Sequence, residues 1–146
     1  MREPVLDVRG LKKHFPVRKG MLSRVSSVVH AVDGVSFSVG QGETLGLVGE
    51  SGCGKSTVGK LILRLIDPTA GEITLSGARI DGLSREGMRA HRQDLQVVFQ
   101  DPYSTLNPRM RVRDVIAEPI INFGLAKDRA DLDRRVAHAL DTVRLP

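Results

Sequence analysis

A glycine-rich segment in the first half of the chain carries the clearest chemistry. Gly49–Ser56 reads Gly-Glu-Ser-Gly-Cys-Gly-Lys-Ser, which is a glycine, four residues and then Gly-Lys-Ser. Glycines allow positive φ angles and bring backbone N–H groups close to the oxygens of an anion. Lys55 adds a full charge for the outer phosphates of a nucleotide, and the hydroxyl of Ser56 is a ligand for Mg²⁺. The pattern predicts a loop that binds a nucleoside triphosphate, and we expect MgATP.

The elements on either side favour this prediction over an ordinary glycine-rich turn. Thr44–Val48 is nearly all apolar, as is typical of a strand buried on both faces. Ser56–Ile66 is predicted to be a helix, ended by Asp67 and Pro68, and its N-terminus adds a partial positive charge facing the phosphates. Strand, loop and helix in this order are the context of a phosphate-binding loop. The apolar stripe of the helix consists of Val58, Leu61, Ile62 and Leu65.

Cys53 lies inside the loop, and we interpret it as a small residue at a variable position. A catalytic thiol needs a positioned histidine, and the sequence nominates none of the four histidines for that role. As the only cysteine, Cys53 cannot form a disulfide within the chain. This favours a reducing cytoplasm.

The remaining strands are predicted on both sides of the loop. Val5–Val17 opens with an alternating pattern, and Val35–Val39 alternates again before a turn at Gly40–Gly42. Residues 18–27 between them are polar and predict a loop. Further strands are expected at Glu72–Leu75, Ala78–Ile80 and Leu95–Phe99, with a turn at Ser76 and Gly77.

Helices are expected towards the end of the chain. Ser84 is predicted to cap a helix that runs through Ala90. A loop is expected at Asp101–Pro108, and the later helices are Val112 to about Leu125, broken near Pro119, and Asp128–Arg144, with a stripe of Leu132, Val136, Leu140 and Val143.

Composition excludes several classes of protein. A length of 146 residues predicts one domain, 1–146. The net charge of +5 suits nucleic acid, but aromatic residues are only 3% and the arginines of Asp128–Arg135 alternate with acids, so we predict no nucleic-acid partner. A membrane surface or the cytoplasmic loops of a membrane partner fit this charge better.

The longest apolar stretch, Leu61–Ile66, is interrupted by Arg64 and is too short to span a membrane. No apolar run follows Met1, so we expect no secretory signal.

Several segments together resemble the ATP-binding-cassette transporter ATPases. Phe99–Arg109 resembles the glutamine loop of that family, and in particular of its peptide-importer branch. Gly49–Thr57 is similar to the family's Walker A form. His14–Arg18 and Ala31–Phe37 look like the N-terminal sheet of the oligopeptide and dipeptide importer ATPases.

The resemblance implies an α/β fold with a P-loop NTPase core. An N-terminal antiparallel β subdomain and this core would occupy residues 5–111, and the start of a helical subdomain would occupy 112–146. The family continues with a Ser-Gly-Gly-Gln signature, a Walker B strand ending in Asp-Glu, and a switch histidine, and the sequence contains none of them. The ATPase domain would therefore be incomplete, and we expect the chain to be the N-terminal part of a longer protein.

The resemblance also implies roles by position. Phe15 would stack on the adenine, although it could instead be a core residue on an edge strand. Gln100 would contact Mg²⁺ and the attacking water, or its amide could bond only to neighbouring backbone. Tyr103–Arg109 would face the coupling helices of membrane subunits, or form an ordinary capped loop. The implied catalytic residues are Gln100 and Lys55, the metal ligands are Ser56 and Gln100, and the other nucleotide-binding residues are Gly49, Glu50, Ser51, Gly52, Cys53, Gly54 and Thr57.

The implied function is that of the ATP-binding subunit of an importer, which couples MgATP binding and hydrolysis to uptake of oligopeptides or dipeptides. Its partners would be membrane-spanning permease subunits, through Gln100–Arg109, and a second ATPase subunit. The location would be peripheral, at the cytoplasmic face of the membrane. Nickel and glutathione importers share these motifs, so the cargo stays open. The alternatives are a GTPase or small-molecule kinase, which usually place the loop closer to the N-terminus, and a non-catalytic nucleotide-binding module.

Overall fold

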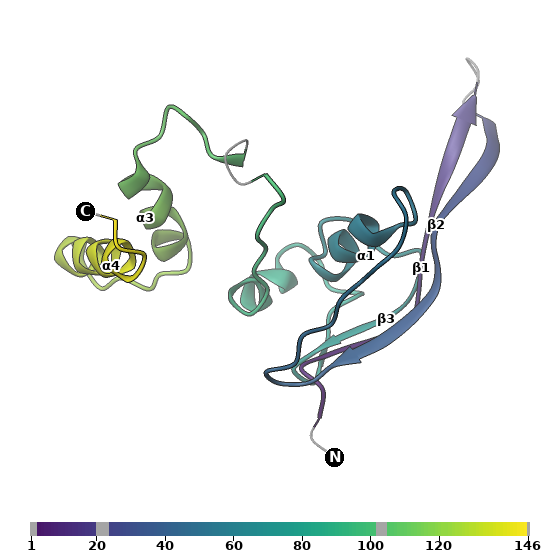
Figure 1. The fold of residues 1–146 in the computed structure, drawn as a ribbon, viewed down its shortest axis with the longest axis horizontal. Coiled ribbons are helices and arrows are strands. Elements are labelled where there is room, and N and C mark those ends of the chain that lie inside the picture. The colour runs from purple at the N-terminus through teal and green to yellow at the C-terminus, as the bar shows by residue number, and fades with distance from the viewer. Residues whose placement is uncertain (1–2, 20–23, 102–104, 146) are drawn as a thin grey trace. The chain divides into compact units, whose positions relative to one another are not determined.

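The computed structural model describes residues 3–19, 24–101 and 105–145. The chain divides into two compact units, and the boundary in the sequence falls between Val97 and Val98. The first unit holds the strands and the glycine loop, and the described part of the second unit includes the helices nearest the end of the chain (Figure 1). The subdomain limits implied by the resemblance, 5–111 and 112–146, stay a prediction.

Four antiparallel strands form the sheet of the first unit, in the order β2-β1-β3-β4. The strands are β1 (Leu6–Lys19), β2 (Arg24–Val39), β3 (Ala70–Leu75) and β4 (Ala78–Arg79). The predicted N-terminal antiparallel sheet is confirmed, and β1 and β2 form a long ribbon (Figure 1).

The ribbon is longer than the sequence pattern predicts. The pairs Val17↔Ser27 and Lys19↔Arg24 belong to the ladder, so the loop predicted at residues 18–27 is wrong for the positions that the structure describes. Pairing across the ribbon satisfies the backbone N–H and C=O groups of these polar residues. Residues 20–23 lie outside the described part of the chain.

The turn between β3 and β4 falls where it is predicted. Ser76 and Gly77 have φ angles of 47° and 82°. Positive φ at both central residues is typical of a two-residue type I′ hairpin turn. Beyond β4, Ile80 is fully buried, and its N–H donates to the carbonyl of Ile73 at 2.8 Å.

Helix α1 spans Lys55–Ile62 and ends about one turn earlier than predicted. Arg64 has a φ of 51°, and its N–H donates to the carbonyl of Leu61 at 3.0 Å. The N–H of Leu65 donates to the carbonyl of Lys60 at 2.9 Å. These two bonds form a Schellman motif, so backbone geometry ends the helix before the predicted proline stop.

A single hydrophobic core joins α1 to the sheet. A short 3₁₀ helix at Gly87–Gln93 contributes Met88 to it. The hydroxyl of Ser84 accepts from the N–H of Gly87 at 3.1 Å, but the N-cap of the helix is Glu86, so the predicted cap at Ser84 is wrong and the helix is 3₁₀ rather than α. The buried core residues are Val8, Leu11, Val32, Val58, Leu61, Ile73, Leu75, Ile80 and Met88.

Two predicted strands do not form. Thr44–Val48 and Leu95–Phe99 carry no strand hydrogen-bond ladder within the described residues. Val48 is 97% exposed and Val98 is 91% exposed, although both lie in runs with the composition of buried strands. A strand buried on both faces needs neighbours in a sheet, and the described part of the chain provides none for these two runs.

Helices α3 (Val112–Asn122) and α4 (Arg129–Thr142) belong to the second unit. The predicted break near Pro119 is wrong: the helix passes through it, and the carbonyl of Pro119 accepts from the N–H of Phe123 at 3.0 Å. Pro119 has no N–H to donate to the carbonyl of Val115, so the helix continues with one backbone hydrogen bond fewer. Among the described residues, no helix is long and apolar enough to cross a membrane.

Helix α4 confirms its predicted position and part of its predicted stripe. A side-chain oxygen of Asp128 caps it by accepting from the N–H of Asp131 at 2.7 Å. Val136 is buried, whereas Val143 follows the helix and is 62% exposed. Leu132 and Leu140 are half-buried.

Candidate nucleotide-binding site

The glycine loop leads directly into α1. Gly52 and Gly54 have φ angles of 84° and 95°, which residues with side chains rarely adopt. A Cβ on Gly54 would lie 2.3 Å from the carbonyl oxygen of Ala31 on β2, so only glycine fits there. Gly54 is also the N-cap of α1, and no side chain of the described residues caps this helix. The first N–H groups of α1 are therefore left for an anion.

The side chain of Lys55 folds back into the loop. Its Nζ donates to the carbonyl oxygens of Gly49 and Glu50, both at 2.6 Å. It also lies 3.4 Å from Sγ of Cys53. Phosphate oxygens would bind the ammonium group more strongly than these neutral carbonyls, because both partners would then be charged. The geometry suits a lysine that exchanges backbone partners for an anion.

The other loop residues are mostly open to solvent. Glu50, Ser51 and Cys53 are exposed, and Thr57 is half-buried on α1. Ser56 is exposed in the first turn of α1, next to Lys55. Its hydroxyl is thus accessible at the position where the sequence predicts a ligand for Mg²⁺.

A cavity of about 330 Å³ lies beside the loop. It runs along β2 and the start of α1, so that apolar walls adjoin the charge of Lys55. A mostly apolar cleft with a few polar groups is typical of a site for an organic ligand. The cavity is lined by His30, Ala31, Val32, Asp33, Val35, Leu47, Val48, Cys53, Gly54, Lys55 and Val58.

Phe15 lies on β1, opposite Val29, and is 39% exposed. The ammonium group of Lys13 sits 4.9 Å from the centroid of its ring. The alternative of a core phenylalanine is therefore wrong. Phe15 is not among the described residues that line the cavity, and its stacking on adenine stays a prediction.

Gln100, the predicted catalytic amide, is exposed and belongs to the second unit. Residues 102–104 of the predicted permease-facing loop, Tyr103 included, lie outside the described part of the chain. Farther along, the side-chain oxygen of Asn107 accepts from the N–H of Arg109 at 3.0 Å, which stabilises a turn. The roles of Gln100 and of this loop stay predictions.

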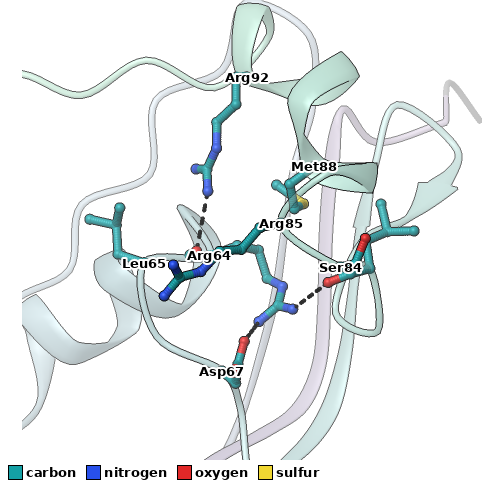
Figure 2. A pocket seen from close by; sticks show the side chains of 8 residues that line it. Arg64, Leu65, Asp67, Ser84, Arg85, Met88 and Arg92 are labelled. Atoms are coloured by element: carbon teal, nitrogen blue, oxygen red, sulfur yellow. Dashed lines mark hydrogen bonds and ion pairs between the residues drawn. The ribbon is translucent and has the colours of Figure 1, made fainter.

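Arg64 connects the end of α1 to the segment after β4, a role that the sequence analysis did not predict. Its side chain is 6% exposed and donates to the carbonyls of Ile80 at 3.0 Å and Leu83 at 2.9 Å. It also pairs with Asp67 at 2.6 Å (Figure 2). Arg92 donates to the carbonyl of Arg64 at 3.2 Å, across a pocket of about 200 Å³. Because protein acceptors already occupy these guanidinium groups, we interpret the pocket as a junction between α1 and the β3–β4 hairpin.

The structure also brings together two histidines beside the cavity, and their spacing in the sequence does not predict this. His14 on β1 is paired directly with His30 on β2, and Asp33 lies close to both. A hydrogen bond and the charge of Lys12 lower the pKa of Asp33 below its ordinary value. Only the register of the ribbon brings these residues together.

Sequence comparison finds extensive matches. The model of the family described as ABC transporter matches residues 32–146. Glutathione import ATP-binding protein GsiA of Shigella boydii serotype 4 (strain Sb227) is 51% identical over 143 residues, which cover 98% of this chain and 23% of that protein. GsiA of Escherichia coli (strain K12) is also 51% identical over 143 residues, again 23% of its length. The chain thus spans less than a quarter of these relatives.

Solved structures share the fold. The dimeric ATP-binding cassette MJ0796, in a post-hydrolysis state with ADP and Pi, matches with a TM-score of 0.78 and 23% identity, over 97% of this chain and 58% of that chain. CbiO1 of Clostridium perfringens, part of the ABC transporter complex cbiONQ, matches with a TM-score of 0.74 and 25% identity, over 99% and 52%. The predicted fold, a partial cassette ATPase with an N-terminal antiparallel β subdomain, is confirmed.

Proposed function

Because the chain belongs to the ABC transporter family, we propose that Gly49–Thr57 binds MgATP and that the chain serves in the ATP-binding subunit of an importer. The observation that carries the proposal is the position of Lys55. Its ammonium group is held inside a glycine loop by two carbonyls, at 2.6 Å each, at the uncapped start of α1. Such a site offers a mobile cation and fixed N–H groups to the same phosphate chain.

The binding event that we propose is an exchange of partners. The phosphates replace the carbonyls of Gly49 and Glu50 as acceptors for Lys55, and the N–H groups at the start of α1 donate to them. Ser56 would hold Mg²⁺, which would neutralise charge on the outer phosphates. The proposed role of Gln100, which would contact Mg²⁺ and the attacking water, rests on the resemblance of Phe99–Arg109 to the glutamine loop.

We propose a small peptide as the cargo of the importer. The support is the 51% identity with GsiA, whose name states that it imports glutathione. Glutathione belongs to the same chemical class as the oligopeptides and dipeptides that the motifs predict. Uptake of a nickel ion has no such support among the relatives described above.

We propose two kinds of partner. One is a second ATPase subunit, and the dimer formed by the MJ0796 cassette supports this. The other is a membrane-spanning permease that docks on Gln100–Arg109, and the place of CbiO1 in a transporter complex supports it. Bound in this way, the subunit would be peripheral, at the cytoplasmic face of the membrane.

Replacement of Lys55 tests the nucleotide site. We expect Lys55→Ala to weaken ATP binding at least tenfold, about 1.4 kcal/mol, in calorimetric titration of the purified chain. Lys60→Ala is the matched control, because Lys60 is an exposed lysine on the same helix. GTP titrated in parallel should bind more weakly than ATP.

Other results of these titrations would contradict the proposal in different ways. Equal ATP affinity in the wild type and Lys55→Ala would refute the phosphate-loop assignment. A preference for GTP would instead favour a GTPase. An equal loss in Lys60→Ala would mean that general positive charge, and not the position of Lys55, explains binding.

A further inference from the structure

The β1–β2 ribbon brings together three side chains of types that can bind a metal ion. They lie beside the cavity next to the glycine loop, which His30 and Asp33 line. His14 pairs directly with His30, and Lys12 pairs with Asp33. The register shifts between these two pairs, since Ala31 adds a residue to β2. Side chains alternate along a regular strand, so this irregularity allows His30 and Asp33, three positions apart, to share one face.

The ligand atoms of the three residues are close to one another. Each residue offers one atom, and these atoms lie within 4.8 Å of one another. Nε2 of His14 is 3.5 Å from Oδ1 of Asp33, and Nδ1 of His30 is 3.7 Å from Oδ2. Ligands about 2.1 Å from a tetrahedral Zn²⁺ are roughly 3.4 Å apart. The rings of His14 and His30 stack with their centroids 3.9 Å apart, so they would have to turn for both nitrogens to face one ion.

One of these atoms has no hydrogen-bond partner. Nε2 of His14 is buried and makes no hydrogen bond within the described part of the chain. Its 3.5 Å contact with Asp33 does not satisfy it. A buried polar atom without a partner is uncommon in proteins and calls for a bound ion, water or ligand. A cation among the three residues would accept its lone pair.

The chemistry of the set selects the class of ion. Two imidazole nitrogens and a carboxylate are the donors that Zn²⁺ and neighbouring transition metals prefer, whereas Mg²⁺ favours oxygen ligands alone. The side chains of His30 and Asp33 are each 54% exposed, so an ion can enter from solvent. Lys12 pairs with Oδ1 of Asp33 at 3.2 Å, whereas Oδ2 of the same carboxylate faces His30.

We propose that His14, His30 and Asp33 form a binding site for one divalent transition-metal ion of the zinc class. The ion would join β1 to β2 at the irregular point of their ladder. The site is separate from the Mg²⁺ that accompanies the nucleotide, because neither Ser56 nor Gln100 belongs to it. It therefore does not depend on the proposed function.

Zinc titration without nucleotide tests this inference. The full chain carries Cys53→Ser in every sample, so that the thiol cannot bind the metal. We expect one Zn²⁺ per chain by calorimetry, and at least tenfold weaker binding in both His30→Ala and Asp33→Asn. His138→Ala is the matched control, since His138 is an exposed histidine outside the cluster, and it should bind zinc as the parent does.

A second readout identifies the ligands directly. Co²⁺ in place of zinc should give visible absorption bands that His30→Ala removes, with the circular dichroism spectrum unchanged. The proposal is overturned if no stoichiometric zinc binds, if His30→Ala binds zinc as tightly as the parent, or if His138→Ala loses as much. Displacement of the bound zinc by millimolar Mg²⁺ would also overturn the proposal, because the site would then not select zinc over magnesium.

Discussion

At the scale of a single residue, Gly54 decides whether the glycine loop can pack against β2. Its φ of 95° is unfavourable for any residue with a side chain, and a Cβ would overlap the carbonyl oxygen of Ala31 at 2.3 Å. That contact is with backbone, so no side chain can move aside. The loop and β2 thus approach as closely as they do only because position 54 has no side chain.

We predict that Gly54→Ala destabilises the first unit by at least about 2 kcal/mol and abolishes ATP binding. Thermal unfolding and nucleotide titration measure the two effects. Gly59→Ala is the control, because Gly59 lies inside α1 and a Cβ added there would meet nothing within 4 Å. That change should stabilise the helix by about 0.5–1 kcal/mol. An unchanged melting temperature for Gly54→Ala would contradict the steric argument.

At the scale of an element, the first turn of α4 depends on ionised aspartates. Asp131 accepts from the N–H of Lys127 at 3.1 Å and pairs with Arg135 and Arg134, both at 3.1 Å. The Lys127 N–H, followed by Arg135 and Arg134, lowers the pKa of Asp131 from 3.8 to about 2. A carboxylate at this end of a helix also interacts favourably with the helix dipole.

We predict an acid-sensitive contribution of Asp131 to stability. Because its folded-state pKa is lowered, the contribution is complete above the unfolded-state value of 3.8 and is lost as the pH falls towards about 2. The melting temperature of Asp131→Asn should therefore lie below that of the wild type near pH 7, and the two should converge near pH 2. Asp141→Asn is the control, since Asp141 is exposed and makes no ion pair among the described residues. A constant difference at all pH values would contradict the prediction.

At the scale of the whole molecule, binding and hydrolysis of ATP have different requirements. Binding depends on the glycine loop and on α1, which follows it directly in sequence. Hydrolysis also needs an acidic group to complete the metal shell and orient the water, and it needs precise placement of both. The 146 residues contain no Walker B acidic pair and no Ser-Gly-Gly-Gln segment.

We therefore predict that this chain, by itself, binds ATP without meaningful turnover. Phosphate release from the purified protein is the measurement, with Lys55→Ala as the control for contaminating ATPases. Steady release near 1 s⁻¹ or above, in the range typical of enzymes, would contradict the prediction if Lys55→Ala abolished it. An acidic group elsewhere in the chain would then have to supply the missing chemistry.

The sequence by itself determined the features that depend on neighbouring residues. The glycine loop at Gly49–Ser56 is one, since its conformation depends on its own glycines and on the helix that follows it. The type I′ turn at Ser76 and Gly77 is another, because its φ angles depend on two adjacent residues. The position of α4 was equally readable, because Asp128 caps a pattern of helical period.

The tertiary structure decided everything that depends on which backbone lies alongside which. Pairing between β1 and β2 converts a polar stretch into strand, and its register brings His14 to His30 and Asp33. In contrast, Thr44–Val48 and Leu95–Phe99 have the composition of strands but no ladder in the described structure. A strand is stabilised by hydrogen bonds to a neighbour that can be far away in sequence, so composition alone cannot make one form.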